Sequence, residues 1–192
     1  STTLNGSGDI NLTGTGGSGN NGFGIYTKTG SNVIGNANYT GNITFNADSL
    51  SFANLAVQAA SAGSVIFRTV NTATSIGIAG ASGGLALTSA ELGSISAGRI
   101  IIGRTDNAGA VTANAYTWGT HVTLLSGNGG IVINGAQAMG AKTFTAQTTG
   151  TGDITIASNG SITSTATGTA ITLASADRFI NNKGAAALSA TA

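Results

Sequence analysis

The segment GDITIASNGSITS, residues 152–164, decides the fold class of this chain. Its apolar residues Ile154, Ile156 and Ile162 stand at even-numbered positions, whereas Thr155 stands between two of them. Because successive side chains of a β-strand point to opposite faces, this alternation predicts short strands with one apolar and one polar face. The same pattern recurs in GDINLTG (8–14), GNITFNA (41–47) and GTAITLAS (168–175). The chain therefore repeats one short strand pattern along its length.

The apolar runs return at a nearly constant interval of roughly 20–23 residues, which is typical of solenoids in which each repeat forms one coil. This interval separates Ile43 from Val65, Val65 from Leu85, Ile100 from Val122, Val122 from Phe144, and Ile131 from Ile154. Neither the Leu-x-x-Leu-x-Leu frame of leucine-rich repeats nor the Gly-Gly-x-Gly-x-Asp frame of calcium-binding repeats is present. The interval therefore predicts an all-β, right-handed parallel β-helix with about three short strands in each coil.

Changes of parity between neighbouring apolar runs favour a coil over a flat sheet. Leu50 and Phe52 stand at even positions, whereas Leu55 and Val57 stand at odd positions. On one unbroken strand these two pairs would face opposite sides of the sheet. We therefore expect a corner near residues 53–54, which lets both pairs point inward. A similar change between Ile162 and Ile171 places a corner near Gly168.

Two further features agree with stacked coils. The chain contains no proline, as expected where nearly every strand N–H pairs with a neighbouring coil. Helical patterns are nearly absent, and the best of them is TSAELGSISAG, residues 88–98. There Thr88 or Ser89 can cap a single helical turn, with Glu91 near its positive end.

Composition argues against several classes of function. The 192 residues are 41% hydrophobic but only 7% charged, and the net charge is +1. The lysines and arginines are scattered, so no basic cluster indicates a nucleic-acid partner. Without cysteine there is no thiolate metal site, and no apolar run approaches the length of a membrane span. We therefore expect neither a cofactor nor a membrane span. Residues 1–192 are expected to form one β-helix segment of a larger protein, with residues 1–40 less regular.

Tyr116, Trp118 and His121 are the candidate residues for contact with glycans. Tyr116 and Trp118 are two positions apart, so they share one face of a strand, and exposed aromatic rings suit sugar rings. Ordinary packing of these residues at a corner of the coil is the alternative interpretation, in which His121 is a surface histidine beside an aromatic ring.

Three other groups of residues point to different chemistry. Asp153 and Asp177 are separated by about one repeat and could stack beside Arg178 as a polysaccharide-degrading site. Asp106, His121 and Ser126 have the residue types of a catalytic triad, and Ser82 lies in the Gly-x-Ser-x-Gly sequence GASGG at residues 80–84. Thr163, Thr165, Thr167 and Thr169 alternate as in ice-binding solenoids. Solvated charges, turns and a wet outer surface are the favoured interpretations of these groups.

Three segments resemble the repeat region of filamentous-haemagglutinin-like large exoproteins. They are LTSAELGSISAGRIIIGRTDNAGAVT (87–112), VTLLSGNGGIVINGA (122–136) and SADRFINNKGAAALSA (175–190). The resemblance covers most of the chain from about residue 41 onward. It implies a right-handed parallel β-helix, two-partner secretion across the bacterial outer membrane, and a role in adhesion or biofilm. The family's secretion domain and an Arg-Gly-Asp motif are not recognised in the chain, so no functional residue is carried over.

The sequence thus favours a structural and adhesive shaft segment of a secreted bacterial surface adhesin, without catalysis. Its expected partners are cell-surface glycans, host or biofilm matrix, and further copies of itself joined head to tail. A polysaccharide-degrading β-helix enzyme and an ice-binding solenoid are the alternatives.

Overall fold

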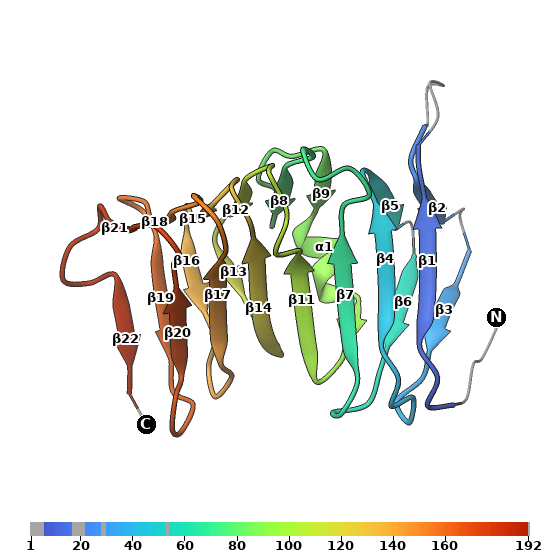
Figure 1. The fold of residues 1–192 in the computed structure, drawn as a ribbon. Coiled ribbons are helices and arrows are strands. Elements are labelled where there is room, and N and C mark those ends of the chain that lie inside the picture. The colour runs from blue at the N-terminus through green and yellow to red at the C-terminus, as the bar shows by residue number, and fades with distance from the viewer. Residues whose placement is uncertain (1–5, 17–21, 28–29, 53, 192) are drawn as a thin grey trace.

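The computed structural model describes residues 6–16, 22–27, 30–52 and 54–191. It is nearly all β, with 46% strand and 3% helix, and its long sheets are parallel. The strands stand side by side along one axis, with the N-terminus at one end of the molecule and the C-terminus at the other (Figure 1). This is a parallel β-solenoid, so the predicted fold class is confirmed.

One parallel sheet, here called the long sheet, runs through the whole molecule. Its seven strands follow the order β1-β4-β7-β11-β14-β17-β20. They are β1 (Ile10–Gly14), β4 (Ile43–Ala47), β7 (Ser64–Arg68), β11 (Arg99–Gly103), β14 (His121–Ser126), β17 (Phe144–Thr148) and β20 (Ile171–Ala174). Each strand pairs with the corresponding strand of the next coil, so the order of the sheet is the order of the coils.

Shorter sheets form the other sides of the coil. A six-stranded sheet contains β21 (Phe179–Asn181), β18 (Ile154–Ile156), β15 (Ile131–Ile133), β12 (Val111–Ala113), β8 (Ile76–Ile78) and β9 (Leu85–Leu87). A four-stranded sheet contains β13 (Tyr116–Thr117), β16 (Ala136–Ala138), β19 (Ser161–Ser164) and β22 (Leu188–Ala190). Nearer the N-terminus, β10 (Ile95–Ser96), β6 (Leu55–Gln58) and β3 (Asn32–Gly35) form one sheet, and β2 (Ile25–Thr27) and β5 (Leu50–Phe52) another.

The register of the long sheet gives the length of each coil. Ile43 pairs with Val65, Ile100 with Val122, and Val122 with Phe144, so these partners are one predicted interval apart. The prediction for Val65 was wrong, because Val65 pairs with Ile100, and Leu85 pairs with Ile76. The coil after Val65 is longer because it contains the β8–β9 pair and the helix. The first coil is also long, since Ile10 pairs with Ile43.

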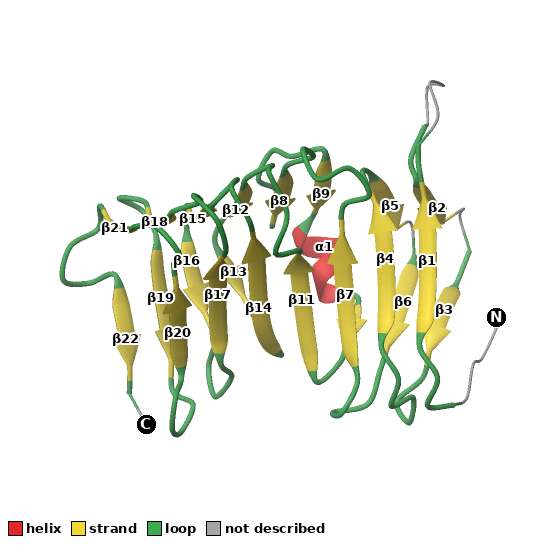
Figure 2. Cartoon of the chain, viewed as in Figure 1, coloured by secondary structure: helices red, strands yellow, loops and turns green. Residues whose placement is uncertain are grey.

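The single predicted helical turn is present as α1 (Ser89–Gly93), the one helix of the described residues (Figure 2). Thr88 is its N-cap, and its hydroxyl oxygen accepts a hydrogen bond from the backbone N–H of Glu91 at 3.2 Å. The Glu91 carboxylate in turn accepts from the N–H of Thr88 at 2.8 Å, which completes a capping box. Its other oxygen accepts from the N–H of Phe52 at 3.0 Å, so α1 is tied to the preceding coil.

Two corners that reverse the parity of the chain have left-handed backbone geometry. Asn54 has φ of 57° and Gly168 has φ of 74°. The side chains flanking the first corner, Phe52 and Leu55, are both buried, as the prediction required. Residue 53, the other half of this predicted corner, lies outside the described residues. The corners therefore turn successive apolar runs toward the same core.

The core consists of columns of inward side chains stacked along the axis. One column of the long sheet contains Ile10, Ile43, Val65, Ile100, Val122, Phe144 and Ile171. The next contains Leu12, Phe45, Phe67, Ile102, Leu124, Ala146 and Leu173. Middle members are fully buried, whereas the end members are only partly buried. No helix of the described residues is long and apolar enough to cross a membrane.

Candidate functional sites

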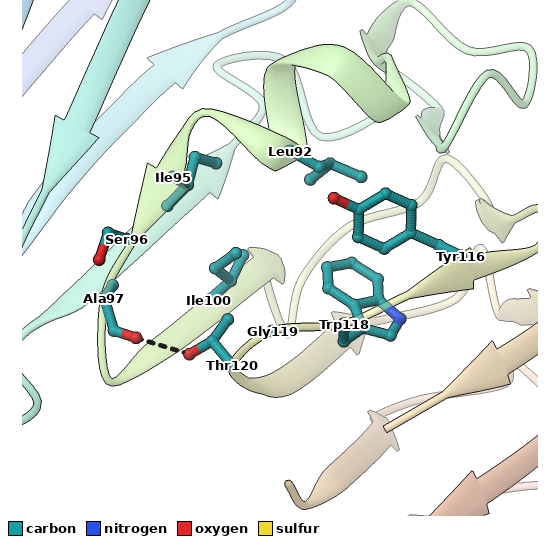
Figure 3. Close-up of a pocket in the computed structure, with 9 residues that line it drawn as sticks. All are labelled: Leu92, Ile95, Ser96, Ala97, Ile100, Tyr116, Trp118, Gly119 and Thr120. Carbon is teal, nitrogen blue, oxygen red and sulfur yellow. Dashed lines mark hydrogen bonds between the residues drawn. The ribbon is translucent and has the colours of Figure 1, made fainter. Parts of the chain in front are cut away.

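The aromatic pair Tyr116 and Trp118 packs against the interior of the coil (Figure 3). The ring centroids are 4.7 Å apart, and the ring planes meet at 74° in an edge-to-face contact. Trp118 is only 4% exposed, and its indole N–H donates to the Gln137 side-chain oxygen at 2.9 Å. Gln137 is itself buried and donates to the carbonyl oxygen of Asn114 at 2.7 Å. This arrangement fixes the Trp118 ring as part of the core.

A small cavity of about 110 Å³ lies beside this pair, next to α1. Figure 3 shows Leu92, Ile95 and Ile100 around it, with the Tyr116 hydroxyl on the side of Leu92. Pockets for drug-sized ligands usually measure about 300–1,000 Å³, so this cavity is smaller than that range. Contact of Tyr116, Trp118 and His121 with glycans stays a prediction. In this structure Tyr116 and His121 are partly exposed, whereas Trp118 is buried.

His121 begins strand β14 and is held as a neutral ring. Its Nδ1 accepts the backbone N–H of Thr143 at 3.1 Å and lies 2.8 Å from the Thr143 hydroxyl. A ring nitrogen that accepts from a backbone N–H carries no proton, so Nε2 carries it. Burial lowers the pKa of His121, and the positive charges of Arg99 and Lys142 lower it further.

The His121 side chain lines a shallow surface hollow of about 270 Å³. His121 and Lys142 line it, together with Ser61, Ser96 and the backbone of Gly98. None of the described residues around this hollow is acidic. The guanidinium of neighbouring Arg99 donates to the Thr123 hydroxyl at 3.0 Å on the outer face of the long sheet. The hollow is therefore a weakly basic surface feature.

The lowered pKa of His121 predicts a loss of stability in acid. Because the folded-state pKa lies below the unfolded value, this contribution is present above the unfolded pKa and is lost as the pH falls through the folded pKa. The substitution His121→Asn retains an oxygen that can accept from the Thr143 N–H but removes the titrating group. We expect the urea midpoint of the variant to fall less than that of the parent between about pH 7 and about pH 5. Equal decreases of the urea midpoint in the parent and the variant would show that His121 does not contribute to the loss of stability in acid.

The structure separates the three residues of the sequence-based triad. His121 and Ser126 begin and end the same strand and have opposite parity, so they point to opposite faces. Ser126 is fully buried, and its hydroxyl has no hydrogen-bond partner within the described structure. Asp106 is paired with Arg104, whose Nη2 donates to the carboxylate at 2.7 Å. Asp106, His121 and Ser126 therefore do not form a catalytic triad.

Ser82 also lacks the geometry of a hydrolase nucleophile. It lies in the connection between β8 and β9, and another strand rather than a helix follows it. A nucleophile elbow requires a strand followed directly by a helix. GASGG lies in the loop between these two strands, and its first residue, Gly80, belongs to a turn.

The proposed acidic pair of the enzyme alternative does not stack in the predicted way. The register sets Ile154 beside Phe179, which places Asp153 beside Arg178 and leaves Asp177 one position away. The Arg178 guanidinium donates to both oxygens of Asp153, at 2.9 and 3.3 Å, and its backbone N–H donates at 3.2 Å. The Asp153 carboxylate raises the pKa of Arg178 through these bonds. Asp153 is therefore held in a bidentate ion pair across two coils.

The alternating threonines do not form a regular array. Among them only Thr163 lies in a strand, β19, whereas Thr165, Thr167 and Thr169 lie in the connection to β20. The neighbours of Thr163 in its sheet are Ala138 and Ser189, so the threonine row does not continue from coil to coil. Within the described residues no group of three or more histidine, aspartate or glutamate side chains is placed to bind a metal ion.

One surface contains none of the candidate residues predicted from the sequence, namely the last described coil of the solenoid. Ile171, Leu173, Phe179, Leu188 and Ala190 line an open, mostly apolar hollow of about 550 Å³ there. Phe179 is 46% and Leu188 40% exposed. The register places Ile171, Phe179 and Leu188 beside the inward residues Phe144, Ile154 and Ile162 of the preceding coil.

Comparison with family models, with curated proteins and with solved structures gives no match to this chain.

Proposed function

We propose that this chain is a structural and adhesive shaft segment of a secreted bacterial surface adhesin, which acts without catalysis. The observation that supports this most strongly is the seven-stranded parallel sheet that runs unbroken from the first coil to the last. A stack of this kind extends in one direction and presents long polar faces, which suits attachment at a distance from the cell.

The geometry of the polar side chains agrees with a role without chemistry. The carboxylates of Asp106 and Asp153 are each paired with an arginine. The polysaccharide-degrading alternative needs two carboxylates that converge on a cleft, or carboxylates free to act on a substrate. We propose that cell-surface glycans and the host or biofilm matrix are the partners of the side faces.

Attachment of protein-coated beads tests this function. Beads that carry the folded chain are expected to adhere to bacterial or host-cell surfaces more than beads that carry the same chain unfolded in urea. The soluble polysaccharide of those surfaces is incubated with the protein in parallel. Attachment no greater than the control would contradict the adhesive function. Shortening of the polysaccharide, lost in the double variant Asp153→Asn and Asp177→Asn, would favour the enzyme alternative instead.

A further inference from the structure

A hollow of about 490 Å³, here called the Arg68 hollow, lies on the outer face of the long sheet near the C-terminal ends of its strands. Strands β4, β7, β11 and β14 stand side by side there (Figure 1). Each of them has a neighbour on both sides, so the hollow lies within the stack of coils. Its volume is in the usual range for ligand pockets. The lining residues are Asn46, Arg68, Arg104, Thr105, Asp106 and Leu125.

The hollow lies where a glycine interrupts a row of outward positions on the sheet. Asn46 of β4 pairs with Arg68 of β7. The register of β11 with β7 brings Gly103 next to Arg68, and on its other side Gly103 pairs with Leu125 of β14. Gly103 has φ of 97°, which L side chains rarely adopt, and it adds no side chain to the row. Space is therefore left between the side chains of Arg68 and Leu125.

Arg104 and Asp106 form an ion pair at one wall of the hollow. The Arg104 guanidinium donates to both carboxylate oxygens of Asp106, and the bond from Nη2 measures 2.7 Å. Its Nη1 also donates to the carbonyl oxygen of Thr69 at 3.0 Å. The hydrogen bonds from Arg104 lower the pKa of Asp106, so this carboxylate is charged at neutral pH. The charge of Arg104 is therefore balanced, and its guanidinium is held in place.

Arg68 supplies the uncompensated charge of the hollow. Its exposed side chain has no hydrogen-bond or ion-pair partner among the described residues. Its positive charge adds to the stronger effect of Arg104 in lowering the pKa of Asp106, so Arg68 lies near that ion pair. Two arginines and one aspartate leave one net positive charge at the hollow. A guanidinium whose donors are unused can bind a carboxylate through two parallel hydrogen bonds.

We propose that the Arg68 hollow binds the carboxylate group of an acidic glycan, one that contains uronic acid residues. Arg68 donates to the carboxylate, and the side chains of Asn46 and Thr105 provide hydrogen bonds for sugar hydroxyl groups. Leu125 provides an apolar surface for the C–H groups of the sugar ring. A nucleic acid is disfavoured, because its phosphates require a cluster of cations and Asp106 repels them. This inference rests on the proposed adhesive function, since it names the class of glycan that one side face binds.

Titration with an oligomer of galacturonic acid, followed by ¹H–¹⁵N NMR, tests this site. In the parent, the backbone amide signals of Arg68, Gly103 and Thr105 are expected to shift. The methyl-esterified oligomer, which has no carboxylate, should leave them unchanged. Arg68→Gln is expected to weaken binding at least about tenfold, because hydrogen bonds between charged groups are the strongest. Asn46→Asp should weaken it similarly, because the new carboxylate stands beside Arg68 and competes for its guanidinium.

Lys183→Gln is the matched control, because it removes one positive charge from an exposed residue far along the chain from the hollow. Distant exposed charges are screened by salt, so the affinity of this variant is expected to stay within about twofold of the parent. A parent without shifts at the hollow, or an Arg68→Gln variant that binds as well as the parent, would overturn the proposal.

Two further outcomes separate this site from other ligands and from the adhesive function. Tighter binding of a sulfated oligosaccharide or of a DNA oligonucleotide at the same amides would overturn the assignment to carboxylates. Failure of bead attachment with galacturonate binding intact would reject adhesion and keep the site. Bead attachment without galacturonate binding would reject the site and keep adhesion.

Discussion

Phe67→Ala is expected to lower the free energy of unfolding by about 3–5 kcal/mol, the usual cost of removing a buried phenylalanine ring. Phe67 is fully buried in β7, and its ring centroid lies 5.2 Å from that of Phe45 and 6.2 Å from that of Phe52. The substitution removes the transfer energy of the ring and leaves a cavity between two coils that cannot collapse without bending their sheets. Urea denaturation followed by far-ultraviolet circular dichroism measures the loss.

Phe23→Ala is the matched control for this experiment. Phe23 is 41% exposed and, among the described residues, stacks on the exposed ring of Tyr26, at 6.1 Å between centroids. The same chemical change there is expected to alter the free energy of unfolding by less than about 0.5–1 kcal/mol. Equal losses of unfolding free energy for the two substitutions would show that Phe45, Phe52 and Phe67 do not form the centre of the N-terminal core.

Asn107→Ala is expected to cost about 3 kcal/mol, because it leaves several buried groups without a partner. Asn107 is fully buried at the corner that follows β11. Its side-chain oxygen accepts the hydroxyl of Thr69 at 2.9 Å, and its amide donates to the carbonyl oxygens of Gly109 at 2.6 Å and Thr74 at 3.3 Å. These bonds join two neighbouring coils at one corner. The urea midpoint of the variant measures their contribution.

Ser126→Ala is the corresponding control in the next coil. Ser126 is equally buried, but its hydroxyl has no partner within the described structure. Removal of an unpaired buried hydroxyl is expected to be neutral or slightly stabilising. A large loss of stability for Ser126→Ala, or none for Asn107→Ala, would show that the hydrogen bonds of Asn107 do not stabilise this corner.

The fold could be predicted from sequence where local pattern and coil length agree. Ile43 and Val65, or Ile100 and Val122, are one coil apart, and both members of each pair are buried. The prediction failed for Val65 and Leu85, because a fixed period does not reveal an inserted strand pair. Leu85 has the inward parity of a new coil, but it pairs with Ile76 inside the same coil.

The candidate sites depended on contacts that spacing alone does not give. Asp153 and Asp177 are about one coil apart, but a shift of one position in register brings Arg178 rather than Asp177 beside Asp153. The sequence made Trp118 a candidate for stacking on a sugar ring. In the structure its indole is buried and hydrogen-bonded to Gln137, which lies on the next coil. The contacts of Asp153 and Trp118 depend on the exact register between neighbouring coils. The spacing of residues in the sequence does not determine that register to a single position.

The solenoid is expected to behave as a one-dimensional stack in which each coil is stabilised by its neighbours. Single-molecule force spectroscopy, with the chain held at its two ends, tests this most directly. The coils should come off one after another, and each should release roughly 70–120 Å of extended chain. A single event that releases the whole chain at once would contradict the claim, because it would show a globular domain with one indivisible core.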